Sequence, residues 1–214
     1  MRVCFHLHSK YSKDSFLSLE KIAEIAKKNK IDVVILSDHN NLVSKDEIEK
    51  IKEIKIIAGE EIKTKEGEII GIFLKEKIEK ELSLKETIKK IKEQNGLVIV
   101  PHPFDLFRTK RIKKKALFEN IDEIEIVEIF NSRTIFNFFN KKAEEFAKKH
   151  QKIIIIGSDA HSQFEIDRAI IEMEDFKDQF DFLKKLKEAK FYPKKTSLFI
   201  QPIVIINKIL RFFI

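Results

Sequence analysis

Short runs rich in valine and isoleucine recur along this 214-residue chain, and each is followed by an amphipathic stretch studded with lysines. Such runs are typical of buried strands, whereas apolar residues at helical spacing are typical of helices that cover a sheet. Alternating strands and helices favour βα units, in which helical connections bring successive strands into parallel pairs. The sequence therefore predicts an α/β fold built on a mainly parallel sheet or barrel.

The expected elements follow from this alternation. The predicted strands are Arg2–His6, Val33–Ser37, Ile56–Glu61, Glu68–Leu74, Leu97–Pro101, Ile124–Phe130, Ile153–Gly157 and Ala169–Met173. Ser44 with Glu47 and Ser83 with Glu86 have the capping-box spacing that starts a helix, and the second of these helices is expected to stop near Asn95. The other predicted helices are Ser18–Asn29, Thr134–His150, Phe180–Ala189 and Pro202–Phe213.

The length suits one domain with one core, which we assign to residues 1–196. The segment 197–214 is the most apolar, but Pro202 and Arg211 interrupt it and it is short for a membrane span. We expect an amphipathic helix there that docks on the same domain. An anchor on a membrane surface is the alternative.

The composition limits the class of partner and the compartment. The formal net charge of +7 comes from dispersed lysines, which favour nucleic acid only modestly. Most of the nineteen phenylalanines, including Phe136, Phe138 and Phe139, fall at core-like helix positions, so no aromatic and basic binding platform is predicted. The single cysteine, Cys4, excludes an internal disulfide and fits a reducing compartment. With no signal-peptide pattern in the first residues, a cytoplasmic location is expected.

Five of the six histidines lie at the carboxyl ends of predicted strands: His6, His8, His39, His102 and His161. In parallel α/β barrels the carboxyl ends of the strands form the rim where active sites are built. Because His6 and His8 are two residues apart, their side chains point to the same side of a strand. Cys4 is expected on that side, one step deeper, as a small core residue rather than a ligand.

Carboxylates accompany these histidines at the same ends of the strands, namely Asp14, Asp38, Glu61 and Asp159. A mixture of imidazole and carboxylate suits Zn²⁺, Mn²⁺ or Fe²⁺, whereas a lone cysteine cannot form a thiolate zinc site. The sequence therefore predicts a metal centre at the rim.

Five short motifs carry a resemblance to a known family. They are His6-Leu7-His8-Ser9 with Ser12 and Asp14, Ser37-Asp38-His39-Asn40, Gly59-Glu60-Glu61-Ile62, Pro101-His102-Pro103 and Gly157-Ser158-Asp159-Ala160-His161. In this order they resemble the motifs of the PHP (polymerase and histidinol phosphatase) superfamily, and in particular its stand-alone metal-dependent phosphoesterases.

This resemblance implies a distorted, TIM-like (β/α)₇ barrel with two or three divalent ions, Mn²⁺, Zn²⁺ or Fe²⁺. In the implied ligand set, one ion is bound by His6, His8, Glu61 and Asp159, a second by Glu61 and His102, and a third by Asp14, His39 and His161. The family motif also implies that Glu61 is the ligand and that Glu60 faces solvent or a lysine.

One histidine common in the family is missing, and aligning Gly71 with the family glycine puts Glu68 in its place. Glu68 is therefore a predicted ligand, and an oxygen ligand favours harder ions such as Mn²⁺. An exposed edge charge, like that of Glu66, is the alternative for Glu68.

The implied activity is hydrolysis of phosphate esters by metal-bound hydroxide, on a phosphorylated small molecule or a nucleotide. His39, His102 and Asp159 are the predicted catalytic residues, with Asp38 as another possible proton donor. Asn131 and Arg133 are the predicted substrate-binding residues, because an arginine can clamp a phosphate. Two alternatives stay open: a nuclease acting on single-stranded nucleic acid, and a PHP fold whose metals are structural.

Overall fold

The computed structural model describes residues 1–200, 202, 206 and 210. Its strands are β1 (Arg2–Leu7), β2 (Val33–Leu36), β3 (Asp38–His39), β4 (Lys55–Ile57), β5 (Gly59–Thr64), β6 (Gly67–Ile72), β7 (Leu97–Val100), β8 (Ile126–Asn131), β9 (Ile153–Gly157), β10 (Ala169–Glu172) and β11 (Lys190–Pro193). Its helices are α1 (Leu19–Lys28), α2 (Lys45–Ile48), α3 (Leu84–Glu93), α4 (Lys114–Glu119), α5 (Asn137–Lys149) and α6 (Gln179–Leu186), with a 3₁₀ turn at Ile121–Glu123. The predicted strands are confirmed to within a few residues except Ile56–Glu61, which is divided into β4 and β5 in different sheets, whereas β3, α4 and β11 were not predicted. The helix predicted at Pro202–Phe213 falls mostly outside the described residues.

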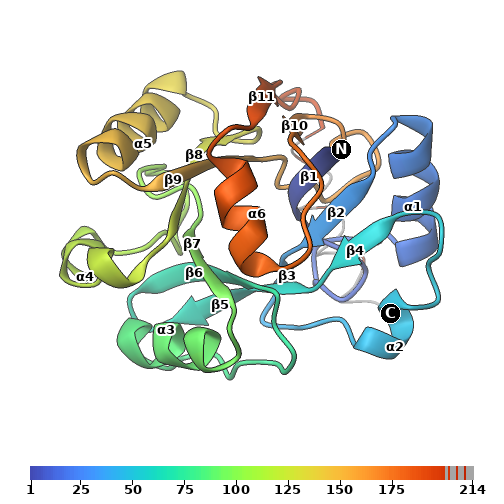
Figure 1. Ribbon diagram of the computed structural model, residues 1–214. Helices are drawn as coiled ribbons and strands as arrows, with labels where there is room; N and C mark the ends of the chain where they lie inside the picture. The colour runs from blue at the N-terminus through green and yellow to red at the C-terminus, as the bar shows by residue number, and fades with distance from the viewer. Residues whose placement is uncertain (201, 203–205, 207–209, 211–214) are drawn as a thin grey trace.

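The strands form two sheets, β11-β10-β1-β2-β4 and β3-β5-β6-β7-β8-β9. The sheets adjoin along two lines. On one side β2 leads into β3 and β4 leads into β5. On the other side the Ser158 amide donates to the Phe5 carbonyl (2.9 Å), and Leu7 forms a parallel bridge with Ala160. The predicted single-domain α/β fold, a distorted barrel, is confirmed, with α1 on one flank and α3, α4 and α5 on the other (Figure 1).

Two of the predicted strands depart from the expected parallel order: β10, which runs antiparallel to both β1 and β11, and β6. β6 runs antiparallel to both β5 and β7. The reason is the tight turn between Thr64 and Gly67, which joins β5 to β6 with no helix between them and places Gly67 at a φ of +130°. A direct turn reverses the chain, because only a long crossover can return a strand to parallel register.

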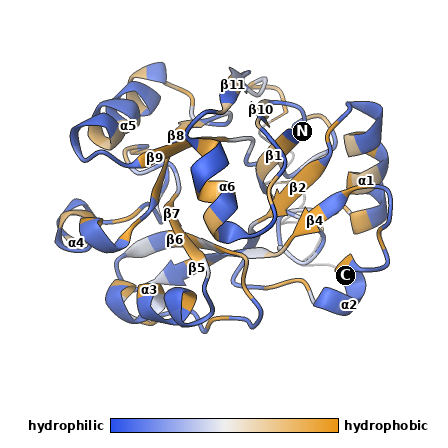
Figure 2. Cartoon of the chain, viewed as in Figure 1, coloured by the Kyte–Doolittle hydropathy of each residue, from blue (hydrophilic) through white to orange (hydrophobic). Residues whose placement is uncertain are grey.

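Apolar side chains fill the barrel and the layer beneath the helices. Phe5, Ile35, Ile70, Ile99 and Ile126 belong to a fully buried cluster formed by residues from successive strands. Two further clusters lie under α1 and under α3 to α5. Figure 2 shows the apolar strands at the centre and polar residues on the outward faces of the helices. None of the helices among the described residues is long and apolar enough to cross a membrane.

An irregularity in β1 changes which side chains face the barrel. The pairing with β2 shifts register between Phe5 and Leu7, and His6 has a φ of +60°. Phe5 therefore packs in the barrel cluster and His6 also reaches inward, while Cys4 packs with Ile22 under α1. Cys4 is a core residue as predicted, but its expected position beneath His6 is wrong, because the shift breaks the two-residue alternation.

Two phenylalanines expected in the core are exposed. Phe136 and Phe138 are about half exposed, whereas Phe139 is buried. The predicted helix was too long at its start: α5 begins at Asn137, so Phe136 lies in the preceding loop.

Candidate metal centre

Nine side chains predicted to be ligands lie together at one end of the barrel. They are His6, His8, Asp14, His39, Glu61, Glu68, His102, Asp159 and His161. Most come from the carboxyl ends of strands or the loops that follow. Glu68 is the second residue of β6, and the antiparallel direction of β6 brings its start to the same rim. That these side chains bind metal stays a prediction, whereas their position at one end of the barrel is a feature of the structure.

The Glu61 carboxylate is at the centre of the group. Its oxygens lie 3.4 Å from His6 Nε2, 3.5 Å from His8 Nε2, 3.2 Å from His39 Nδ1 and 3.2 Å from His102 Nε2. Burial alone raises the pKa of this carboxyl, but His39 and His6 outweigh it and hold the pKa well below its ordinary value. Glu61 is therefore ionised and shared by four imidazoles.

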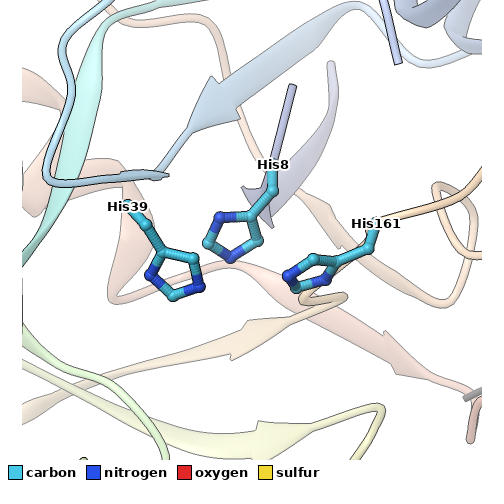
Figure 3. A group of neighbouring side chains, drawn as sticks. All are labelled: His8, His39 and His161. Carbon is cyan, nitrogen blue, oxygen red and sulfur yellow. The ribbon is translucent and has the colours of Figure 1, made fainter. Parts of the chain in front are cut away.

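Two further carboxylates extend the group. Asp159 Oδ1 lies 3.4 Å from His8 Nε2 and 3.5 Å from His161 Nδ1. The oxygens of Asp14 each lie 3.5 Å from a ring nitrogen, one of His39 and one of His161. In Figure 3 the rings of His8, His39 and His161 converge, with the His8 centroid 4.4 Å from that of His39 and 4.2 Å from that of His161. Stacked buried imidazoles facing carboxylates form a dense set of nitrogen and oxygen donors.

Several of these donors lack a hydrogen-bond partner. Among the residues that the structure describes, His6 Nε2, His8 Nε2 and His39 Nδ1 are buried without one, although Glu61 oxygens lie 3.2 to 3.5 Å from them. A buried polar atom without a hydrogen bond costs about 1–3 kcal/mol, so three in one place indicate a missing partner. Groups of three donors lie within 4.8 Å of one another, including His6, His8 and Glu61. Nitrogen and oxygen donors at this spacing fit divalent cations.

A buried glutamate that sequence reasoning missed holds two of the histidines. Glu128 Oε1 lies 2.7 Å from His6 Nδ1, which leaves His6 Nε2 facing the cluster. Glu128 Oε2 accepts from the His102 amide (2.8 Å) and from Asn131 Nδ2 (3.1 Å). Carboxylates of this kind fix the tautomer and direction of a ligating imidazole. The available signal was one acidic residue inside the apolar run Ile126–Phe130.

Ser12 and Asp38 support His8 from the other side. His8 Nδ1 lies 3.3 Å from Ser12 Oγ, which donates to Asp38 Oδ1 (2.7 Å) and accepts from the His39 amide (2.8 Å). The Asp38 carboxylate also accepts from the amide and hydroxyl of Ser9, both at 2.7 Å. Asp38 therefore orders the loop after β1, and these bonds do not favour its alternative role as a proton donor.

Backbone strain accompanies the site. His6, His102 and Asp159 have φ values of +60°, +31° and +49°, in the left-handed region that residues with a Cβ rarely adopt. Such strain persists only where surrounding contacts over-determine it, and it clusters at functional sites. The bonds to Glu128 described above supply such contacts for His6 and His102.

Glu60 does not occupy the position expected for it. Its side chain is fully buried and its Oε2 accepts from the Ile78 amide (3.0 Å), so the expectation that it faces solvent or a lysine is wrong. The segment before α3 covers the outer face of β5, and its amide takes the place of water. Burial raises the pKa of Glu60 to about 7.

Arg133, the cation that the sequence favours for substrate binding, is not the one that contacts the cluster. Arg133 pairs with Glu165 (2.6 Å), and Glu165 also accepts from the His161 amide (3.1 Å), so Arg133 braces the loop of His161. Arg108 contacts Asp159 directly and donates to Asn131 Oδ1 (3.2 Å). Lys110 Nζ lies 3.2 Å from Glu68. Arg108 and Lys110 are thus the cations in contact with the cluster's carboxylates, while substrate binding by Asn131 and Arg133 stays a prediction.

Two archaeal sequences are similar to this chain. An uncharacterized protein of Methanocaldococcus jannaschii, MJ0417, is 34% identical over 94% of this chain and 86% of its own length. A second protein of the same organism, MJ1587, is 41% identical over 62% of this chain and 82% of its own length.

Solved structures share the fold at lower identity. One is a two-domain protein from Bacteroides vulgatus described as containing a predicted PHP-like metal-dependent phosphoesterase; it has a TM-score of 0.67 and 18% identity over 91% of this chain. This chain spans only 65% of that protein. Another is the lesion-specific endonuclease PfuEndoQ from Pyrococcus furiosus, with a TM-score of 0.65 and 18% identity over 89% of this chain and 58% of that one. At such identity the likeness concerns the fold alone.

The model of the PHP domain matches residues 5–194, which contain every side chain of the cluster described above and all of the barrel except the first three residues of β1, so the predicted PHP type of the fold is confirmed. This chain therefore belongs to the PHP domain family.

Proposed function

We propose that this protein hydrolyses phosphate esters with the help of two or three divalent ions. The observation that carries the proposal is the Glu61 carboxylate, which is shared by four imidazoles in a buried cluster with unpaired donor atoms. Such ions supply water that is activated near neutral pH and positive charge that offsets the charge growing on phosphoryl oxygens. Phosphomonoesters, including nucleotides, are the first proposed substrates.

The proposed ligand sets combine proximity with the family pattern. His6, His8, Glu61 and Asp159 hold the first ion, Glu61 and His102 the second, and Asp14, His39 and His161 the third. We add Glu68 to the proposed ligands of the third ion, because Glu68 Oε1 lies 3.7 Å from His39 Nδ1. Burial lowers the pKa of His39 to about 4, so its imidazole is neutral near pH 7. A neutral imidazole favours a role as ligand over a role as leaving-group acid.

Arg108 and Lys110 have a proposed role at the edge of the cluster. Both contact carboxylates there, and both are partly exposed. A guanidinium that contacts the cluster and solvent can pair with two oxygens of an incoming phosphate. We assign Arg108 to phosphate binding beside the predicted Asn131, and Arg133 to holding the loop of His161.

A phosphoester panel tests the proposal. The full chain is stripped with chelator, reloaded with Mn²⁺, Zn²⁺ or Fe²⁺, and assayed on phosphomonoesters and on short single-stranded oligonucleotides. Asp159→Asn and His8→Ala should each lower turnover by more than about 100-fold, because loss of a ligand exceeds the usual effect of an outer partner. Asp122→Asn, which changes an exposed aspartate on the 3₁₀ turn, is the matched control.

Cleavage of single-stranded nucleic acid is the second candidate, supported by the shared fold with an endonuclease and by the net charge of +7. The panel separates the two candidates by product. A metal-loaded preparation that is inert toward both classes, or activity that survives Asp159→Asn, would refute the hydrolase proposal. The metals would then be assigned a structural role.

A further inference from the structure

A groove outside the metal centre lies between α4 and α5, which are neighbouring helices in Figure 1. Its volume is about 450 Å³. Its apolar floor is mostly aromatic, with Phe104, Phe118, Phe139 and Phe146 among its lining residues. Phe118 is 42% exposed and can stack with a planar ring, whereas Phe139 and Phe146 are buried and supply apolar contact.

The walls of this groove are strongly basic. Arg111, Lys114, Lys142 and Lys149 line it, against the single acid Glu145. Within the described part of the chain none of these four cations forms an ion pair, whereas Lys92 on the neighbouring α3 pairs with two glutamates. An unneutralised basic wall above an aromatic floor complements an anion that also carries flat apolar groups.

Exposed rings continue from the groove toward the metal centre. Phe107, Phe136 and Phe138 are 48% to 63% exposed, and their ring centroids follow one another at 5.6 and 6.0 Å. Lys142 Nζ lies 5.4 Å from the Phe138 centroid. Exposed aromatic side chains in a contiguous row are uncommon on soluble proteins and mark interaction sites.

The loop Phe104–Ile112 connects this row to the metal centre. Buried Asp105 accepts from the Phe107 amide and from Thr134 Oγ1, both at 3.0 Å, and so ties this loop to the loop after β8. Arg108, which follows Phe107 in this loop, contacts Asp159 in the cluster. A chain lying in the groove would therefore reach the metal centre over Phe107.

We propose that the groove and the row of exposed rings bind a single-stranded nucleic acid whose reactive phosphate ester lies in the metal centre. This inference rests on the proposed hydrolysis of phosphate esters and names the substrate class. The bases stack on the exposed rings, and the backbone phosphates pair with Lys114, Lys142, Lys149 and Arg111. Single strands fit better than duplexes, because only unpaired bases present both faces to aromatic side chains.

The test measures binding separately from turnover. Fluorescence anisotropy follows a labelled single-stranded DNA of about ten nucleotides, a length within the range of such grooves, with the full chain in chelator so that no cleavage occurs. Phe138→Ala should weaken binding about tenfold through loss of one stacking face. Lys142→Gln should lower the slope of log affinity against log salt by about one unit.

Matched controls lie elsewhere on the surface. Phe180→Ala removes a ring that is exposed on α6, and Lys89→Gln removes an exposed charge on α3, and neither should change affinity or salt slope. Equal effects of the groove and control variants overturn the inference, as does binding of polyglutamate as tight as that of the oligonucleotide. A dimer in solution that Phe138→Ala dissociates would also overturn it, since the groove would then be an interface between two copies.

The two proposals fail differently. Turnover of phosphomonoesters without oligonucleotide binding refutes the groove and leaves the hydrolase. Groove-dependent oligonucleotide binding by a metal-loaded chain that cleaves nothing refutes the hydrolase and leaves the groove.

Discussion

Replacing Gly157 by alanine should damage the metal centre through Glu128. A Cβ at this position would overlap Glu128 Oε1 and lie 2.9 Å from Glu128 Cδ and 3.0 Å from His6 Cβ. The carboxylate must therefore move away from His6 Nδ1, which now lies 2.7 Å from it. Loss of one hydrogen bond to a charged group costs about 1.5–3 kcal/mol, and overpacking adds about 1–3 kcal/mol. We expect a loss of about 3 kcal/mol in the free energy of unfolding.

Urea denaturation of the full chain measures this change, with Gly71→Ala as the matched control. Gly71 also lies in a buried strand, but the three atoms nearest to a Cβ there belong to the side chains of Ile91 and Leu74, which can move. The control should cost less than about 1.5 kcal/mol, as a modest shape change in a core does. The hydrogen bond with Glu128 orients the His6 ring so that Nε2 faces the cluster. Gly157→Ala should therefore also weaken metal binding by about 10–100-fold, measured against a competing chelator.

A double-mutant cycle separates this mechanism from general crowding. In a Glu128→Ala background the overlapping carboxylate is absent and only the approach to His6 Cβ remains. Gly157→Ala should then cost about 1 kcal/mol instead of about 3, which is a coupling energy of about 2 kcal/mol. The reasoning is refuted if Gly157→Ala costs no more than Gly71→Ala, or if its effect is unchanged when Glu128 is removed.

Four further predictions concern single side chains and the C-terminal segment. Glu68→Gln should lower metal content measured by elemental analysis, whereas Glu66→Gln should not, because Glu66 caps the Leu84 amide and an amide oxygen can still accept. Burial raises the pKa of Cys4 to about 12, so iodoacetamide should label it only after unfolding, as mass spectrometry would show. Since the pKa of Glu60 rises from 4.5 to about 7 on folding, this carboxyl disfavours the fold once ionised. As the pH rises from 4.5 to about 7, the free energy of unfolding of the wild type, compared with that of Glu60→Gln, should therefore fall by up to about 3 kcal/mol. Urea titrations at each pH measure this difference. A chain ending at Thr196 keeps the bond from the Thr196 amide to the Ser132 carbonyl (2.9 Å) but should be less soluble and melt earlier; unchanged behaviour would contradict docking of residues 197–214.

The sequence predicted the strand-end histidines because their signal is local. A short apolar run defines a strand, and the residues after it must lie at the rim of a parallel barrel. His8, His39 and His161 could therefore be placed without knowing which strands pair. The direction of β6 was missed, since it depends on a tight turn that the alternation of strands and helices does not reveal.

Glu128 and Gly157 illustrate what local pattern cannot give. An acidic residue inside an apolar strand reads as a surface charge unless its partners are known, and those of Glu128, His6 on β1 and the His102 amide after β7, are brought to it by tertiary structure. Gly157 read as a strand-end glycine for the same reason. Only the paired strands show that the missing Cβ leaves room for a carboxylate.

The loop Phe104–Ile112 shows why the groove also escaped sequence reasoning. Its residues Arg108 and Lys110 contact carboxylates of the metal centre, whereas Leu106 and Arg111 line the groove on its other side. In the sequence these cations form one dispersed basic stretch, and the opposite wall comes from α5, some thirty residues later. The fold divides the stretch between two faces. Positive charge on a single braced loop thereby extends from the proposed phosphate-binding position to the proposed path of the strand, which is the continuity that a nucleic-acid backbone requires.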